Sequence, residues 1–146
     1  AIFIFLLIDF RSLKDTLLAI VPLVIGVLWM VGFIWLFGIK FNLVNFMALP
    51  LIIGIGIDDG VHILHRYNIE GRMTLEQVMR FTGRAILLTS LTTSIGFGSM
   101  ALASHRGIAS MGQVLVIGVL SCFFTSAFVL TSLIALKKAI FKQKLK

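Results

Sequence analysis

The sequence predicts an all-α, polytopic bundle of transmembrane helices, and three observations support this fold class. Of the 146 residues, 59% are hydrophobic and only 13% are charged. The mean hydropathy of the chain is +1.08. Apolar runs recur along the sequence, each near the roughly 20 residues that a helix needs to cross a bilayer. This composition excludes an ordinary soluble domain, and we treat residues 1–146 as a single transmembrane domain.

Four apolar runs have the length of complete membrane spans. They cover residues 16–37, 43–64, 85–103 and 111–136. Residues 1–8 are also apolar, but they are too few to cross a bilayer and lack the basic start of a signal peptide. We therefore interpret them as the end of a truncated helix, and the chain as part of a longer protein.

The one sizeable connection, residues 66–84, joins the second and third spans. Thr74 and Gln77 have the spacing of a capping box. The apolar residues that follow recur at helical spacing and form one face, with polar residues on the opposite face. We expect a short amphipathic helix lying at the membrane surface here. Residues 137–146 are rich in Lys and are expected to form a basic cytoplasmic tail.

The distribution of positive charge predicts the orientation. All but Lys40 and Arg106 of the 13 Lys and Arg residues fall on one side if the four spans alternate. Because Lys and Arg near helix ends are retained in the cytoplasm, the C-terminus and the connection 66–84 should be cytoplasmic. The membrane is expected to be the cell (inner) membrane. The net charge of +7 then reflects topology and attraction to anionic lipids, and a nucleic-acid partner is not expected.

Asp58 and Asp59 lie inside the second span, where a charge is unfavourable by roughly 2.5 to 3.5 kcal/mol on insertion scales. Acidic residues at membrane depth usually mark an ion path or a substrate site, although a polar packing pair is the simpler alternative. We therefore predict that both acids are proton-coupling residues. They point about 100 degrees apart on a helix, so they are poorly placed to share one proton directly.

A candidate proton path leads away from the acids. His62 and His65 follow Asp58 at helical spacing toward the cytoplasmic end, and the third span carries a run of hydroxyls that includes Thr92 and Thr93. The hydroxyls could equally serve as interhelical hydrogen bonds. A metal site at the histidines is disfavoured because no Cys or Glu lies nearby, so we expect no metal and no cofactor.

Pro and Gly residues are expected to shape the helices around the acids. Pro50 removes a backbone donor, which predicts a kink or local unwinding. Small residues allow another helix to approach closely or leave a passage for water. The glycines given this packing role are Gly54, Gly56, Gly60, Gly96 and Gly98. Cys122, the single cysteine, is expected to be a buried small residue.

These motifs together resemble a known family. The segments that carry the resemblance are Gly54–His62, His65–Tyr67, Leu91–Gly98 and Gly107–Gly112. They are similar to the resistance-nodulation-division (RND) superfamily, in its MMPL-like branch, which is related to sterol-sensing domains. The resemblance implies the C-terminal part of one six-helix half-unit, with Asp58 as the proton-coupling acid. Asp59 departs from the branch, which often has Tyr at that position.

The resemblance implies an exporter of lipids or other hydrophobic compounds that is driven by the proton-motive force. A sterol-sensing-like lipid receptor or scaffold without transport remains the alternative. No enzymatic activity is expected, since an intramembrane aspartyl protease needs a second Asp on another helix. The expected partners are membrane lipids, a lipid-like substrate, protons and the remainder of the parent transporter; a homo-oligomer is left open.

Overall fold

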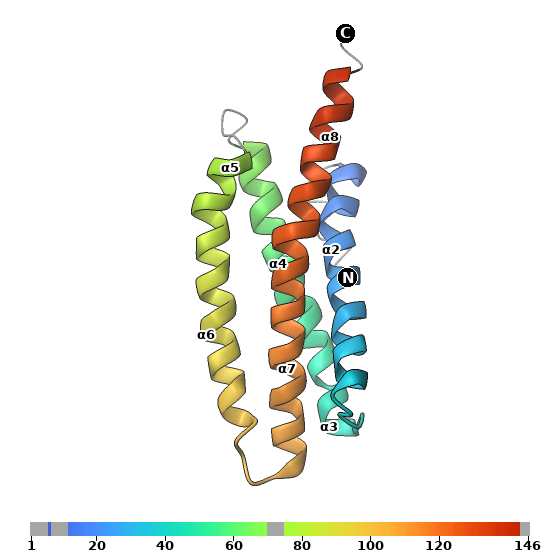
Figure 1. Cartoon of the computed structure of the whole chain (residues 1–146), viewed down its shortest axis with the longest axis vertical. Helices are drawn as coiled ribbons and strands as arrows, with labels where there is room; N and C mark the ends of the chain where they lie inside the picture. The colour runs from blue at the N-terminus through green and yellow to red at the C-terminus, as the bar shows by residue number, and fades with distance from the viewer. Residues whose placement is uncertain (1–5, 7–11, 70–74, 144–146) are drawn as a thin grey trace.

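The long apolar runs of the sequence fold into helices that lie side by side, as the computed structural model shows (Figure 1). It describes residues 6, 12–69 and 75–143. Among these residues there is no strand, and the predicted all-α fold class is confirmed. The elements in chain order are α2 (Leu13–Leu36), α3 (Leu43–Phe46), α4 (Ala48–Ile69), α5 (Leu75–Val78), η1 (Met79–Gly83), α6 (Arg84–Met100), α7 (Arg106–Thr125), η2 (Ser126–Leu130) and α8 (Thr131–Gln143).

Helix α2 ends where the sequence supplies a glycine. Gly38 has a φ of +64°, a left-handed conformation that costs other residues more than glycine. The amide of Ile39 donates to the carbonyl of Ile34, and the amide of Gly38 donates to that of Trp35. This Schellman motif satisfies the last carbonyls of α2 and turns the chain toward α3.

The second predicted span is broken near its start. Asn42 and Asn45 form a capping box around α3, which ends at Phe46, and α4 begins at Ala48. Pro50 therefore lies in the first turn of α4 and not in the middle of a continuous helix. In the first turn, the missing N–H of proline leaves no helical hydrogen bond unmade.

The connections differ from the expected boundaries because the helices run on. Residues 66–69 continue α4, and α5 leads through the π-helical turn η1 directly into α6. Residues 137–143, expected as a tail, form the last part of helix α8. Lys137 Nζ in this part lies 2.7 Å from Asp15 Oδ1 of α2. The expected helix end at residues 1–8 lies outside the described residues except for Leu6, as do the Thr74 cap and residues 144–146.

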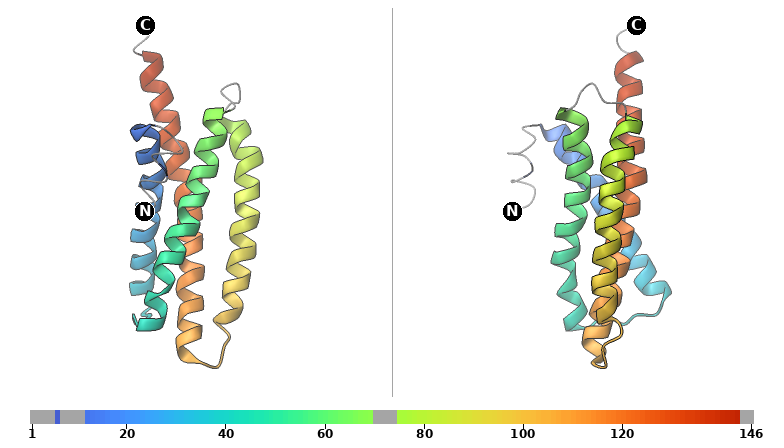
Figure 2. Two further views of the ribbon diagram at one scale, coloured as in Figure 1. Left: turned by 180° about the vertical axis from the view of Figure 1, so that it is seen from behind. Right: turned by 90° about the vertical axis from the view of Figure 1, so that its left-hand side faces the viewer.

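Helix α7 lies at the centre of the packing and contacts α2, α4 and α6 (Figure 2). Two apolar clusters fill the interior along its length. One contains Met30, Ile34, Ile52 and Leu115 near the end of the bundle that carries α3, and the other contains Ile63, Leu64, Val78 and Leu130 near α5. We call these two ends of the molecule the α3 end and the α5 end.

Three of the described helical segments are long and apolar enough to cross a membrane, namely Asp15–Leu36, Leu43–Tyr67 and Arg106–Lys137. Helix α6 has 17 residues and is not among them. It lies beside the others and runs the same distance along the bundle when joined to α5 and η1 (Figure 1). The organisation in four spans stays a prediction.

Candidate functional site

The two neighbouring acids of α4 lie in contrasting environments. The side chain of Asp58 is 67% exposed, whereas Asp59 is only 6% exposed. Both residues lie midway along α4, between the two apolar clusters. Because adjacent residues on a helix point about 100 degrees apart, only one of them can face the interior when α4 packs on the bundle. The structure places Asp59 there and Asp58 on the outer face.

Both acids nevertheless line one cavity. Its volume is about 270 Å³, and it lies between α4 and α6. The residues that line it are Gly54, Ile55, Asp58 and Asp59 from α4, and Thr89, Ser90 and Thr93 from α6. A space of this size has room for several waters, and its walls carry the polar atoms that hold them. The cavity therefore gives the residues of the buried and the exposed carboxylate one shared space, with hydroxyl-bearing residues on its α6 side.

Two polar atoms at the cavity wall have no protein partner. The Oδ2 atom of Asp59 and the Oγ atom of Ser90 are buried and make no hydrogen bond within the described part of the chain. Buried polar atoms in native proteins are almost always satisfied by protein groups or ordered water. Both atoms belong to residues that line the cavity, so water that enters it is a candidate partner for them.

The predicted hydroxyls divide between two roles. Thr93 lines the cavity, but Thr92 is exposed and donates to the carbonyls of Leu88 and Thr89 at 3.0 and 2.9 Å. Thr89 lines the cavity while its hydroxyl donates to the carbonyl of Ile86 at 2.9 Å. The structure thus brings Thr93 to the acids and leaves Thr92 on the outer surface of α6.

The histidines lie on the outer face of α4. His62 Nε2 is 3.4 Å from Asp58 Oδ1, one helical turn away, and His65 is also exposed. Together they form a polar stripe from Asp58 toward the α5 end. In the described ranges no group of three or more His, Cys, Asp or Glu side chains could hold a metal ion.

The glycines of α4 separate into packed and open positions. A Cβ at Gly56 would lie 2.7 Å from Cys122 Sγ, and a Cβ at Gly60 would lie 3.1 Å from the carbonyl oxygen of Ala19. These two glycines let α7 and α2 approach α4 closely. Gly54 faces the cavity, and a Cβ there would meet nothing within 4 Å.

The glycines of α6 are less constrained. A Cβ at Gly96 would meet nothing within 4 Å, and one at Gly98 would make an ordinary contact of 3.7 Å with Val116. The tighter approach between α6 and α7 is at Gly112, where a Cβ would lie 2.6 Å from the amide nitrogen of Ala101. The close packing of these two helices therefore depends on Gly112 at least as much as on the predicted positions.

A polar network at the α3 end was not anticipated from the sequence. The side chain of Asn45 is fully buried and donates to Ser110 Oγ at 2.8 Å and to the carbonyl of Lys40 at 3.0 Å. Asn42 also donates to Ser110 Oγ, at 3.3 Å. The two asparagines flank a short apolar stretch with capping-box spacing, and this signal could have located the helix start. The network fixes α3, and the break that follows it, against α7.

Comparison with known proteins places the chain in a family. Residues 4–136 match the family described as Patched SSD. A membrane protein of Methanocaldococcus jannaschii is 32% identical over 143 residues, which cover 94% of this chain and 37% of that protein. The hopanoid transporter HpnN of Rhodopseudomonas palustris is 35% identical over 121 residues, 83% of this chain and 14% of the transporter.

A second hopanoid transporter HpnN, from Burkholderia multivorans, is 30% identical over 129 residues, which cover 88% of this chain and 14% of that protein. The chain therefore spans well under half the length of these relatives. No solved structure matches it. Because the Patched SSD match extends over nearly the whole sequence, the chain belongs to that family of sterol-sensing-like membrane domains, and its predicted membership of the RND superfamily is confirmed.

Proposed function

We propose that the chain is part of the membrane domain of a proton-driven exporter of lipids or other hydrophobic compounds. The observation that carries this proposal is the cavity in which a buried and an exposed carboxylate meet three hydroxyl-bearing residues. The names of two relatives, both hopanoid transporters, support a lipid-like substrate. Because the chain covers 14% of each transporter, the remainder of the parent protein supplies other parts of the transport path.

The two acids have different parts in the proposed cycle. Asp58 exchanges protons on the outer face of α4, next to His62 at 3.4 Å. Asp59 holds a proton inside the bundle, where its Oδ2 atom has no partner among the described residues. Water in the cavity connects the two, since the side chains diverge too far to share a proton directly.

Proton movement can be coupled to a change at the boundary between α4 and α6. An ionised carboxylate at membrane depth is unfavourable unless water, a counter-ion or a proton compensates its charge. When Asp59 is ionised, the cavity must stay hydrated and open; when it is protonated, the two helices can approach. One charge moving through 100 mV releases about 2.3 kcal/mol, enough to shift two helix arrangements that differ by a few kcal/mol.

The proposal includes an orientation and further partners. We place the α5 end and the C-terminus in the cytoplasm and the chain in the cell membrane, because the basic residues are concentrated at that end. The exposed side chains of Asp58 and His62 then face the remainder of the parent transporter, where a second polar surface covers them. A homo-oligomer would place another copy of the chain at the same face.

Transport by the full-length protein in proteoliposomes tests the proposal. Vesicles are loaded with a hopanoid or a phospholipid analogue, and an inwardly directed or outwardly directed pH gradient is imposed. We expect substrate movement in one gradient direction only, accompanied by proton flux, and its loss when a protonophore collapses the gradient. Equal movement with and without the gradient would contradict proton coupling.

A sterol-sensing-like receptor that transports nothing is the second candidate, and two observations favour it. One is the family match itself. The other is an apolar groove of about 440 Å³ between α2 and α7, lined by aromatic residues that include Trp29, Phe33 and Phe124. The receptor predicts saturable lipid binding with no proton flux, and such a result in the same vesicles would replace the exporter.

A further inference from the structure

Two serines of α6 have buried hydroxyls without a partner. The Oγ atoms of Ser90 and Ser94 make no hydrogen bond within the described part of the chain. Ser and Thr residues in helices commonly donate to a carbonyl one turn earlier, and Thr92 and Ser99 of the same helix do so. The buried hydroxyls of Ser90 and Ser94 do not follow this pattern. These serines lie four residues apart, which places their hydroxyls on one side of α6, about 6 Å apart along its axis.

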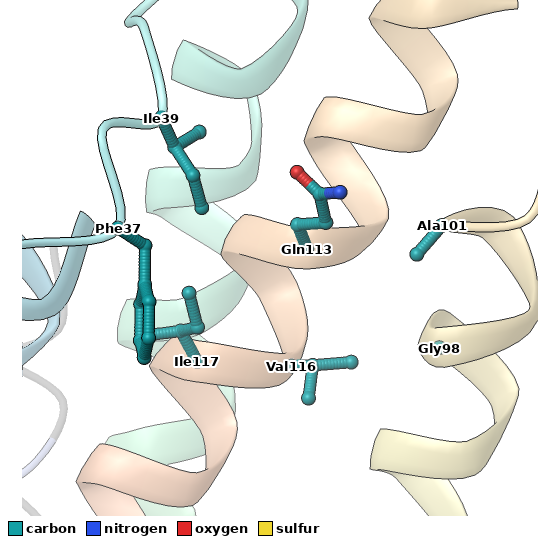
Figure 3. Close-up of a pocket in the computed structure, with 7 residues that line it drawn as sticks. All are labelled: Phe37, Ile39, Gly98, Ala101, Gln113, Val116 and Ile117. Atoms are coloured by element: carbon teal, nitrogen blue, oxygen red, sulfur yellow. The ribbon is translucent and has the colours of Figure 1, made fainter.

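A second cavity lies farther along α6, near the α3 end. Its volume is about 490 Å³, and it is lined by Phe37, Ile39, Gly98, Ala101, Gln113, Val116 and Ile117. Figure 3 shows the amide of Gln113 projecting from α7 between Ile39 and Ala101. Gln113 is exposed, and its amide can bind water at this otherwise apolar mouth.

The segment that separates the two cavities is short. Thr93 lines the cavity of the acids and Gly98 lines the cavity at Gln113. Five residues of helix correspond to about 7.5 Å, a distance that two or three hydrogen bonds can cover. Ser94 lies within this segment. At its outer end a Cβ on Gly98 would lie 3.7 Å from Val116, an ordinary contact, so α6 and α7 approach less closely here than at Gly112.

We propose that Ser94 is a relay in a water-accessible route that links the α3 end of the molecule to the acids through the α6–α7 boundary. The route runs from the mouth at Gln113 past Gly98 to Ser94 and Ser90, and ends at Asp59. It rests on the proposed function, since it supplies the protons that the acids carry. The stripe of Asp58, His62 and His65 opens toward the opposite end of α4, so the acids have one path on each side.

Site-directed cysteine labelling of the full-length protein tests the route. Ser94→Cys is introduced after the native cysteines, including Cys122, have been replaced, and a membrane-impermeant methanethiosulfonate is added to one side at a time. We expect Ser94→Cys to react from the side that carries the α3 end. The matched control is Ile95→Cys, one residue away on the exposed apolar face of α6. This face lies away from the proposed route and within the membrane, so the water-soluble reagent should not react there.

A second variant asks whether the reagent enters through the proposed mouth. Gly98→Leu fills the space beside Val116 and so narrows the proposed mouth. Labelling of Ser94→Cys should then slow by about tenfold, because the reagent reacts with the thiolate, which forms only where water reaches it. Gly96→Leu, on a face where a Cβ meets nothing, should leave the rate unchanged. Reaction of Ser94→Cys only from the α5 side, or no reaction from either side, would overturn the route.

Proton uptake by Asp58→Asn and Asp59→Asn separates this failure from that of the proposed function. If both variants lose uptake while Ser94→Cys stays unreactive, protons reach the acids by another path and the route alone is wrong. If both variants retain uptake, the acids do not couple protons, and both the proposed function and the route are wrong.

Discussion

Helix α4 forms two boundaries with its neighbours, and they use similar residues in opposite ways. On the packed boundary, Gly56 and Gly60 bring α4 close to α7 and α2, and a Cβ would lie 2.7 Å from Cys122 Sγ at Gly56 and 3.1 Å from the Ala19 carbonyl oxygen at Gly60. On the open boundary, Gly54 borders the cavity shared with α6, and a Cβ there would meet nothing within 4 Å. The packed boundary fixes the rotation of α4, and this rotation places Asp59 inside and Asp58 outside. The contrast separates residues that hold the acids in place from residues that give water access to them.

The packed boundary can be broken by Gly56→Leu, which should have the largest effect. The Cβ alone would lie 2.7 Å from Cys122 Sγ and 2.8 Å from Leu23 Cδ1. Overpacking of this kind destabilises a protein by about 1 to 3 kcal/mol or more. We expect a marked loss of folded protein, measured as yield and thermal unfolding temperature in detergent. An unchanged unfolding temperature would show that α4 can move away from α7 freely.

The open boundary can be filled by Gly54→Leu, which should leave folding intact but reduce activity. No atom within 4 Å opposes the Cβ, so the unfolding temperature should stay close to that of the wild type. The leucine displaces water from the cavity of about 270 Å³. Transport and proton uptake should fall by about tenfold, which corresponds to about 1.4 kcal/mol on the barrier. Normal transport at normal stability would mean that water in this cavity has no function.

A smaller effect is expected from Ser90→Ala, which sharpens the comparison at a single hydroxyl. Removing a buried hydroxyl that has no protein partner should not lower the unfolding free energy, because no protein hydrogen bond is lost. Proton uptake should fall by about threefold, because the cavity water loses one ligand near Asp59. Thr92→Val is the matched control, since the hydroxyl of Thr92 donates to its own helix and lies outside the cavity. An equal loss in both variants would assign the effect to α6 as a whole.

The sequence was sufficient for the fold class and for the position of the acids, because both depend on local composition. It predicted that Asp58 and Asp59 diverge, but which of them is buried depends on the rotation of α4. The spacing i, i+3 and i+4 puts Gly56, Asp59 and Gly60 on one face of α4. That this face is the one packed against α2 and α7 follows from the contacts of the two glycines with Ala19 and Cys122, which lie far away in the sequence.

The hydroxyls of α6 show the same limit. A run of Ser and Thr predicts polar contacts, yet adjacent positions point about 100 degrees apart. Thr93 therefore lines the cavity, while Thr92 does not. Pro50 led to the prediction of a kink or local unwinding at that residue, whereas the span is interrupted before it, and Pro50 lies in the first turn of α4. The position of the break at Met47 is set by the asparagine cap of α3 and its hydrogen bonds to Ser110, a contact across 65 residues.

The most direct test of the account is proton uptake and substrate transport by Asp58→Asn and Asp59→Asn in the full-length protein, reconstituted at matched levels. The amide preserves the size of the side chain but cannot carry the proton. The account predicts that both variants fold normally and lose coupled proton uptake together with gradient-driven transport. Wild-type rates of uptake and transport in both variants would contradict it and would reduce the two carboxylates to a structural role.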